Sequence, residues 1–377
     1  MLKVMTIVGT RPEIIKLSRV IDRLDRFTDH VLVHTDQNYD YELNHIFFQE
    51  MRLKKPKYSL KVAGKTPMET IANVLVKSDK VLQKEKPDAV LIYGDTNSCL
   101  AALSAKRRKI PVFHMEAGNR CFDQRVPEEI NRRLVDHLSD INLTISEYAR
   151  RYLLHEGIPG ETVLKVGSCM KEVLEYYRKD IDSSDALQRL KLREKDYFVV
   201  SIHREENLDS DRHFLDLMNS LNALAKVYRK RILVSTHPRT RKKVQQLEPS
   251  FFQPEIEWSK PFGFFDYVSL QTHALCVLSD SGTLPEEAAL LGFPAVALRQ
   301  AQERPEGMEE GVTILSGLKA DRVLPSVKAA VEIAAENHFK KDVVSDYEVS
   351  DVSDKVVKII LSYTDYVRRT VWREGDL

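Results

Sequence analysis

The stretch His-Met-Glu-Ala-Gly-Asn-Arg, residues 114–120, follows directly on the apolar run Ile110–Phe113. Such a run predicts a buried strand of a parallel sheet, because strands covered on both faces read as continuous apolar segments. Glu116 then falls at the carboxyl end of this strand. Open α/β sheets bind their ligands at that edge. We therefore place Glu116 at the predicted ligand edge of the sheet.

Two further acidic residues are expected at the same edge. Asp95 ends the preceding strand-like run, and Glu128 opens a helix-like segment, followed by Glu129. Gathering carboxylates costs stability because each partly buried charge loses hydration, yet the arrangement suits proton transfer. On an exposed helix, Glu128 and Glu129 would instead form i,i+4 pairs with Arg132 and Arg133. We interpret this edge as an active site.

The pattern of a short apolar strand followed by an amphipathic segment repeats along the chain. This alternation indicates parallel sheets with helices on both faces. The strands form two series, separated by the charged segment Tyr176–Lys195, whose period is helical, and 377 residues exceed one ordinary core. We predict an α/β fold of two doubly wound, Rossmann-like domains facing a central cleft. These are residues 1–170 and residues 171–352, with a C-terminal helix at 353–377 that returns towards the first domain.

Composition excludes several classes of function. The chain has 57 basic and 56 acidic residues, a formal charge of +1, so it lacks the basic field of a nucleic-acid-binding protein. Its apolar runs are shorter than the roughly 20 residues that span a bilayer. Its four cysteines show no CxxC spacing, which argues against a disulfide framework or a zinc site. We expect a cytoplasmic protein with reduced thiols, no membrane insertion and no nucleic-acid partner.

The segment Gly9-Thr10-Arg11-Pro12-Glu13 lies between the first predicted strand and the first predicted helix. Glycine permits a tight turn, and proline suits the first position of a helix. The amides at the helix start and the Arg11 guanidinium would attract a phosphate. An ordinary turn with a surface arginine explains this segment equally well. Because the segment lacks the glycine signatures of dinucleotide sites and P-loops, it predicts neither.

The segment Ser-Asp-Ser-Gly-Thr-Leu-Pro-Glu-Glu, residues 279–287, offers a comparable site in the second domain. Ser281, Gly282 and Thr283 supply hydroxyls and amides at a helix start, which suit a diphosphate. Glu287, one turn further on, can accept hydrogen bonds from both hydroxyls of a ribose. A plain capping box, with Ser or Thr before Glu, is the alternative. The position at a second predicted ligand edge favours the diphosphate.

Three more residues are candidates in the second domain. His203 follows its first strand and suits stabilisation of a leaving phosphate, although a lone histidine is more often structural. Arg304 follows the strand-like run Ala295–Leu298 and adds a positive charge at the same edge. Tyr267 belongs to an aromatic cluster at residues 261–267 that could stack on a nucleobase. Core packing is the more frequent use of such clusters.

Together these motifs resemble those of the non-hydrolysing UDP-N-acetylglucosamine 2-epimerase family. The resemblance spans residues 9–306 and implies two Rossmann-like domains in the GT-B arrangement of nucleotide-sugar glycosyltransferases, closing over a UDP-sugar, usually as a homodimer. It implies anti elimination of UDP to a 2-acetamidoglycal and re-addition, with protonation from the opposite face and without NAD or a metal. The motifs, in the family's order, are GTRPE, YGDTNS, HMEAGNR, VPEEINRR, SIHREEN, THPR, SDSGTLPEE and ERPE.

The same resemblance assigns roles to individual residues. A sugar C2 proton is very weakly acidic and inversion handles protons on both faces, so more than one carboxylate is expected. The acid–base candidates are Asp95, Glu116 and Glu128, with His203 near the leaving diphosphate. Those for nucleotide-sugar binding are Arg11, Lys16 and Arg132, and those for diphosphate and ribose are Ser281, Gly282 and Glu287.

The chain departs from the N-acetylglucosamine enzymes at residues 119–126, where they usually carry a different and longer loop after Gly-Leu-Arg-Thr. This loop and the segment KPFGFFDY look like a branch found in capsule and O-antigen loci. That branch epimerises UDP-2-acetamido-2,6-dideoxy-L-talose to UDP-N-acetyl-L-fucosamine, so we expect this substrate, with UDP-N-acetylglucosamine/UDP-N-acetylmannosamine as the alternative. The loop is expected to read C6 and the L-configuration. Residues 37–41 replace the family's Gln-His pair linked to activation by substrate.

Two other classes of protein stay open from the sequence. A GT-B glycosyltransferase needs an acceptor site and usually one base, and a hydrolysing epimerase releases UDP. A catalytically silent nucleotide-sugar sensor would bind ligand but exchange no solvent deuterium at C2. The complete set of carboxylates argues against both classes.

Overall fold

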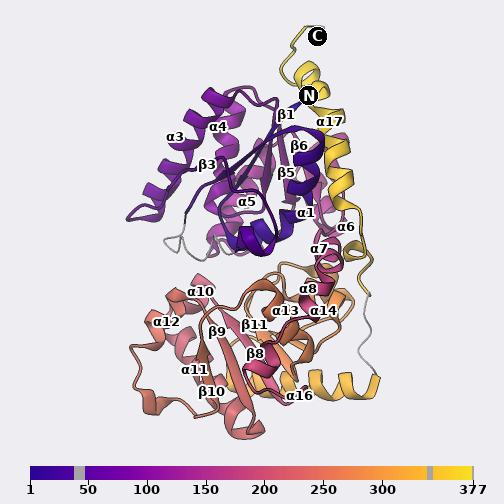
Figure 1. The fold of residues 1–377 in the computed structure, drawn as a ribbon. Coiled ribbons are helices and arrows are strands. Elements are labelled where there is room, and N and C mark those ends of the chain that lie inside the picture. The colour runs from indigo at the N-terminus through magenta and orange to yellow at the C-terminus, as the bar shows by residue number, and fades with distance from the viewer. Residues whose placement is uncertain (38–46, 338–342, 376–377) are drawn as a thin grey trace. The chain divides into compact units, whose positions relative to one another are not determined.

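The computed structural model of the protein describes residues 1–37, 47–337 and 343–375 (Figure 1). The sequence differs from the family's Gln-His pair at residues 37–41. Of these, residues 38–41 lie outside the described ranges. Within the described ranges, no helix is both long and apolar enough to cross a membrane. The chain divides into two compact units: unit 1 is Met1–Glu175 with Asp346–Leu377, and unit 2 is Tyr176–Ser345.

Unit 1 contains a seven-stranded parallel sheet in the order β3-β2-β1-β4-β5-β6-β7. The strands are β1 (Lys3–Val8), β2 (Asp29–His34), β3 (Tyr58–Ser59), β4 (Ala89–Tyr93), β5 (Val112–Ala117), β6 (Ile141–Thr144) and β7 (Val163–Lys165). Strand β4 is buried along its whole length, as expected for the centre of a parallel sheet. The apolar runs in the sequence therefore reflect burial on two faces.

Several helices of unit 1 begin at residues that favour a helix start, such as proline in the first turn or a capping threonine. The described helices of this unit are α1 (Arg11–Phe27), α3 (Pro67–Glu85), α4 (Ala101–Arg107), α5 (Pro127–Leu138), α6 (Glu147–His155), α7 (Met170–Tyr176) and α17 (Val352–Thr370), with a short 3-10 helix η1 (Asn97–Leu100). Helices α1, α3 and α5 carry proline in the first turn, where its missing N–H costs no hydrogen bond. Thr66 caps α3 by accepting from the Glu69 amide (3.1 Å).

The last helix, α17, returns to unit 1 and packs along α1 (Figure 1). Its buried face includes Val356 and Ile360, which are one helical turn apart. An ion pair joins the two helices, with Arg23 Nε 2.9 Å from Asp354 Oδ1. The C-terminal segment therefore contributes to the structure of the first unit.

The order of the unit 1 sheet reverses at β1 and β4, which pair although α1, β2 and α3 separate them in sequence. Folds of this type bind ligands beside the carboxyl ends of such strands. Gly9 follows β1 at this edge. A Cβ at position 9 would lie 1.8 Å from Ser98 Oγ in η1, so the close approach requires glycine. The turns after β1 and β4 therefore pack directly against each other.

Unit 2 has a six-stranded parallel sheet in the order β10-β9-β8-β11-β12-β13, which reverses at β8 and β11. The strands are β8 (Tyr197–Ile202), β9 (Arg231–Thr236), β10 (Ile256–Ser259), β11 (Cys276–Ser279), β12 (Ala295–Ala297) and β13 (Ile314–Leu315). The helices are α8 (Arg178–Asp182), α9 (Ala186–Arg189), α10 (Glu205–Leu208), α11 (Asp211–Tyr228), α12 (Pro238–Val244), α13 (Phe264–His273), α14 (Leu284–Leu291), α15 (Pro305–Glu309) and α16 (Ala320–Asn337). The segment Tyr176–Lys195, whose period is helical, is described throughout and contains the short helices α8 and α9 and no strand.

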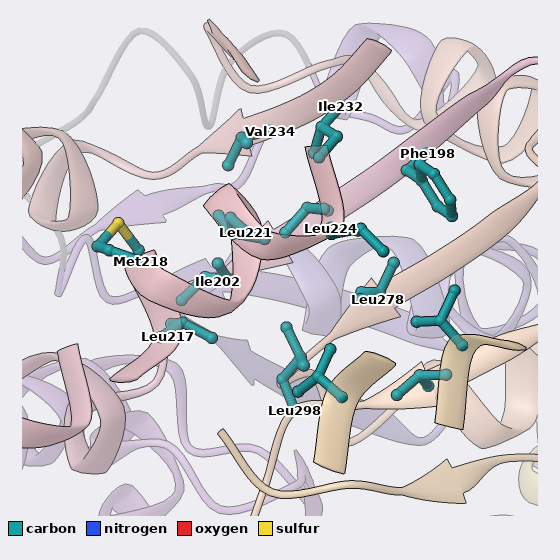
Figure 2. Packing of buried hydrophobic residues seen from close by; sticks show 14 of the residues in the cluster. Phe198, Ile202, Leu217, Met218, Leu221, Leu224, Ile232, Val234, Leu278 and Leu298 are labelled. Carbon is teal, nitrogen blue, oxygen red and sulfur yellow. The ribbon is translucent and has the colours of Figure 1, made fainter. Parts of the chain in front are cut away.

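The core of unit 2 forms between α11 and its sheet. Figure 2 shows Leu217, Leu221 and Leu224 of α11 clustered with Ile232 and Leu278 of the strands, and all five are buried. Burial of one such side chain contributes about 1.5–3 kcal/mol. This packing holds the strands whose ends carry the candidate residues of unit 2. The predicted α/β class with two doubly wound domains is confirmed.

Candidate active site

Glu116 lies in β5 in a backbone conformation that is uncommon for a residue with a side chain. Its φ is +63°, in the left-handed region. The pairing of β5 with β6 shifts register between Met115 and Ala117, which makes Glu116 the extra residue of a β-bulge. A bulge redirects one side chain out of the regular alternation of the strand. Strain of this kind is typical of a functional position.

Two hydrogen-bond donors hold the Glu116 carboxylate. Lys16 Nζ from α1 and Tyr93 Oη from β4 each lie 2.6 Å from Glu116 Oε2. The Lys16 ammonium also lies 5.4 Å from the centre of the Tyr93 ring. Hydrogen bonds to an ionised partner are strong, and these two stabilise the charged carboxylate. The structure thus places Lys16, a predicted nucleotide-sugar ligand, beside the predicted acid–base residue.

Asp95 is anchored by α5. Arg132 Nη2 lies 2.6 Å from Asp95 Oδ2, and Arg132 Nη1 lies 3.3 Å from Glu129 Oε2. Asn131 donates to the backbone carbonyl of Asp95 (2.9 Å). The Asp95 side chain is 21% exposed, whereas that of Arg132 is 3% exposed. Arg132 is therefore an interior anchor that leaves the Asp95 carboxylate accessible at the edge of the sheet.

The acid pair at the start of α5 occupies two environments. Glu129 is completely buried, accepts from the Cys121 amide (3.0 Å) and pairs with Arg133 Nε at 3.2 Å. The pair with Arg133 exists, but it does not lie on an exposed helix face, because the fold buries its acid. Glu128 is half-buried in the first turn of the helix. Glu128 is the member of the pair that solvent can reach more readily.

The turn between β1 and α1 holds a buried acid beside Arg11. Glu13 accepts hydrogen bonds from the Gly9 amide (2.7 Å) and from Thr96 Oγ1 (2.6 Å). Burial raises the pKa of Glu13 above its ordinary value, although these hydrogen bonds oppose the rise. The Arg11 guanidinium lies 5.0 Å from the centre of the Phe47 ring. Glu13 therefore joins the turn after β1 to the turn after β4.

The loop at residues 119–126 contains an interior arginine and an exposed aromatic ring. Arg120 is almost completely buried, so it supports the loop from inside. Phe122 is 64% exposed, and its ring meets that of Tyr152 edge-on with centroids 5.2 Å apart. Of these two side chains, Phe122 is the one that a ligand could contact.

In unit 2 a buried acid orients His203. Asp280, directly after β11, accepts from the amides of His203 (3.1 Å) and Arg204 (3.0 Å) and from Asn207 Nδ2 (3.1 Å). His203 Nδ1 lies 3.2 Å from Asp280 Oδ1, and the His203 side chain is 39% exposed while that of Asp280 is fully buried. With Nδ1 facing the acid, Nε2 is the nitrogen suited to donate to a phosphate oxygen.

The start of α14 is organised around Glu287. Thr283 Oγ1 donates to Glu287 Oε1 (2.9 Å), and Gln271 Nε2 donates to Glu287 Oε2 (2.7 Å). Ser281 Oγ lies 2.9 Å from Thr283 Oγ1. The hydroxyl of Thr283 therefore donates to a carboxylate. In a plain capping box it would instead accept a hydrogen bond from a helix amide. The amides and the dipole at this helix start suit an anion.

The remaining predicted residues of unit 2 differ in their surroundings. Gly282 packs against Glu303, since a Cβ at position 282 would lie 2.4 Å from Glu303 Oε2. Arg304 is almost completely buried, and its Nη2 lies 3.7 Å from Glu286 Oε2. Tyr267 is half-buried in α13. Arg304 thus has an interior acid nearby, which its position in the sequence does not reveal.

Three residues of these sites were not singled out from the sequence. Tyr93 and Asp280 each lie at the end of a predicted strand, so the strand pattern in the sequence could have placed them at a ligand edge. Glu13 follows Thr10 with the spacing of a capping box, which suggests an interaction within the turn. Their partners, however, lie on other elements of the fold and follow no local pattern.

Each unit thus presents its own chemistry where its sheet order reverses. Unit 1 presents Asp95 and Glu116, each paired with a cation, and unit 2 presents His203 and the start of α14. Positioned acids suit proton transfer, and an oriented imidazole with helix amides suits a diphosphate. The fold and these sites define an α/β enzyme that acts on a nucleotide-linked substrate. The chain belongs to the UDP-N-acetylglucosamine 2-epimerase family, whose sequence profile matches residues 22–361.

Three proteins of similar sequence or structure are named as UDP-sugar 2-epimerases. The structure of UDP-N-acetylglucosamine 2-epimerase from Rickettsia bellii is 53% identical, with a TM-score of 0.91 and coverage of 99% of this chain and 100% of that one. The Methanocaldococcus jannaschii enzyme, in complex with UDP-GlcNAc and UDP, is 33% identical, with a TM-score of 0.89 and coverage of 96% and 100%. A Pseudomonas aeruginosa UDP-2,3-diacetamido-2,3-dideoxy-D-glucuronate 2-epimerase is 32% identical over 88% of this chain and 92% of its own length. The predicted enzyme class, a non-hydrolysing UDP-sugar 2-epimerase and so an isomerase, is confirmed.

Proposed function

We propose that the enzyme inverts C2 of UDP-2-acetamido-2,6-dideoxy-L-talose to give UDP-N-acetyl-L-fucosamine for surface polysaccharide synthesis. The observation that carries an epimerase mechanism is the Glu116 site. Its carboxylate stands on a β-bulge, is 12% exposed, and accepts hydrogen bonds from Lys16 and Tyr93 at one oxygen. A carboxylate held in this way keeps one geometry during proton transfer, as general acid–base catalysis requires.

The reaction is an elimination followed by an addition. A carboxylate removes the C2 proton, the C1–O bond to the diphosphate breaks, and its electron pair leaves with UDP as a C1–C2 double bond forms. The same UDP oxygen then attacks C1, and the π electrons take a proton onto the opposite face of C2. Two faces require more than one acid–base group, and we assign these transfers to Asp95, Glu116 and Glu128.

The groups proposed to bind UDP come chiefly from unit 2. Elimination develops negative charge on the diphosphate, which His203 and the amides of Ser281, Gly282 and Thr283 stabilise. The support for His203 is its orientation by the buried Asp280. The further proposed contacts are Glu287 to the ribose, Tyr267 to the uracil, and Arg304 and Arg11 to the nucleotide-sugar.

The choice of sugar is proposed to depend on the loop at residues 119–126. A 6-deoxy sugar carries a methyl group at C6 where N-acetylglucosamine carries a hydroxymethyl group. The exposed ring of Phe122 offers an apolar contact for such a methyl. UDP-N-acetylglucosamine is the second candidate substrate, because the Rickettsia bellii and Methanocaldococcus jannaschii relatives are named for it.

Initial rates with the two UDP-sugars under identical conditions test this assignment. We expect kcat/KM for the 6-deoxy-L-talose compound to be about 10–100-fold higher, the order of discrimination that a pocket achieves on small groups. Inversion should proceed without an acceptor sugar and without accumulation of free UDP. A higher kcat/KM for UDP-N-acetylglucosamine would transfer the assignment to that sugar. Release of UDP without any C2 epimer would contradict both assignments.

We also propose that the enzyme is a homodimer. The support is the outer side of α5, where Ile130 and Leu134 stand one helical turn apart and are 52% and 51% exposed. Apolar side chains that recur on one exposed helix face are commonly covered by a partner. Sedimentation equilibrium of the purified protein should give twice the mass of the chain, and a monomer at micromolar concentration would contradict this.

A further inference from the structure

A buried network of charges lies behind the strand ends that carry Asp95 and Glu116. His114 of β5 and Asp136 of α5 are both completely buried, and His114 Nδ1 lies 2.9 Å from Asp136 Oδ1. The opposite ring nitrogen, Nε2, lies 2.8 Å from the backbone carbonyl oxygen of Gly94. The imidazole therefore spans from α5 to the turn after β4.

Both partners of the His114 ring are hydrogen-bond acceptors. An ionised carboxylate and a backbone carbonyl only accept, so each ring nitrogen has to donate. A neutral imidazole has a single N–H and would direct a lone pair at one of these oxygens in a completely buried site, which is costly. Donation to both oxygens therefore requires a proton on each ring nitrogen, and with it a positive charge on the ring.

The neighbouring groups balance this charge. Arg120 Nη1 lies 2.7 Å from Asp136 Oδ2, and Arg120 Nη2 lies 2.6 Å from Glu156 Oε2 of α6. Burial by itself raises the pKa of Asp136, but His114 and Arg120 outweigh that effect and hold the pKa below its ordinary value. Two cations and two carboxylates thus form a neutral cluster, which makes the buried imidazolium tolerable.

The network is attached to the backbone beside both acid–base residues. Gly94, whose carbonyl accepts from the imidazolium, directly precedes Asp95. The amide of Gly118, two residues after Glu116, donates to Asp136 Oδ1 (3.2 Å). The φ angles are +64° at Gly94, +63° at Glu116 and +82° at Gly118. Glycine adopts such angles freely, but the left-handed conformation of Glu116 persists only where the surroundings determine it.

We propose that His114 is a positioning residue whose charged ring, together with Asp136, fixes the two turns that aim Asp95 and Glu116. Its side chain is completely buried, so it acts through those turns and not on the substrate. The proposal rests on the proposed function, which assigns proton transfer to these two acids. Loss of the ring should misplace both carboxylates while UDP binding by unit 2 is retained.

Replacing His114 by glutamine tests the proposal, with His30→Gln as the matched control. Glutamine can donate to one of the two oxygens but carries no charge. His30 is also a buried imidazole of unit 1 that bridges two partners, with Nδ1 2.6 Å from Asp25 Oδ1 and Nε2 2.9 Å from Thr6 Oγ1. It stands near the amino end of β2, at the opposite edge of the sheet. General effects of losing a buried imidazole should therefore appear in both variants.

The two variants should separate in catalysis. We expect H114Q to lower kcat, measured as C2 inversion and as uptake of solvent deuterium at C2, about 10²-fold, the order of loss for a displacement of ~1 Å. Its Kd for UDP should match that of the wild type, and H30Q should retain kcat. Wild-type kcat in H114Q, or an equal loss of kcat in H30Q, would overturn the proposal.

Nitrogen NMR of the histidine-labelled wild-type enzyme gives a second test that needs no variant to fold. Both ring nitrogens of His114, assigned through their hydrogen-bonded neighbours, should carry protons at neutral pH. An unprotonated nitrogen in this ring would overturn the proposal. The kinetic assay uses whichever UDP-sugar the wild type epimerises. A wrong sugar assignment therefore shows in the wild-type rates with the two sugars, whereas a failed positioning role shows in the kcat of H114Q. The ring spectrum decides even if the wild type epimerises neither sugar.

Discussion

Removal of the Tyr93 hydroxyl tests how Glu116 is held for proton transfer. Tyr93→Phe keeps the buried ring and deletes the 2.6 Å hydrogen bond from Oη to Glu116 Oε2. In the proposed reaction Glu116 is one of the acids that transfer protons at C2, and this bond stabilises its carboxylate as the proton leaves; a hydrogen bond to a charged group contributes about 1.5–3 kcal/mol. At 1.36 kcal/mol per factor of ten in rate, we expect kcat to fall about 10–160-fold.

Tyr58→Phe is the matched control for this substitution. Tyr58 Oη donates to Glu85 Oε1 (2.5 Å) in the same unit, on the edge strand β3. Both variants lose a tyrosine-to-glutamate hydrogen bond, so both should unfold at lower urea concentration, and NMR of the C2 epimers should show a loss of kcat in Tyr93→Phe alone. Unchanged kcat in Tyr93→Phe, or the same loss in Tyr58→Phe, would refute the role given to this hydrogen bond.

Three further predictions concern stability and nucleotide binding. Leu221→Ala should lower the free energy of unfolding by about 2–5 kcal/mol, because it opens a cavity in the core of unit 2; urea unfolding measures this, and a change below that range would mean that the core repacks. Asp280→Asn should weaken UDP binding in calorimetry and lower kcat, because the buried acceptor of His203 Nδ1 is replaced by an amide; wild-type affinity and kcat would argue against this orientation of the ring. Hydrogen bonds from Lys57 and Tyr58 lower the pKa of Glu85 from 4.5 to about 2. Its stabilising effect is therefore complete above pH 4.5 and is lost as the pH falls towards 2, so Glu85→Gln should be less stable than wild type at neutral pH and converge with it in acid, as urea titrations at several pH values would show.

The fold was predictable because burial on two faces leaves a strong signal in the sequence. Strands such as β4 are apolar throughout, and the helices between them carry proline at their starts. The same signal places Asp95, Glu116 and His203 at strand ends. The helical period of the segment Tyr176–Lys195 likewise predicted helices without a strand, but it did not show that the segment divides into two short helices.

The contacts of the sites were not predictable in the same way. Lys16 and Glu116 stand 100 residues apart, and only the tertiary fold, which packs α1 beside the sheet, brings their side chains to 2.6 Å. The left-handed conformation of Glu116 arises from the register between β5 and β6, which no local pattern encodes. The sequence placed Arg304 at a ligand edge but revealed neither its burial nor that of Arg120, because their interior acid partners lie on other elements of the fold.

The discontinuity of unit 1 imposes an order on its folding. Helix α17 covers α1, yet all of unit 2 lies between them in the chain. On the ribosome, unit 2 is complete before α17 has been translated. The part of α1 that α17 covers therefore stays uncovered until α17 has been translated, although an amino-terminal domain ordinarily folds first. Lys16, which donates to Glu116, lies on that same helix, so unit 1 reaches its final state after unit 2.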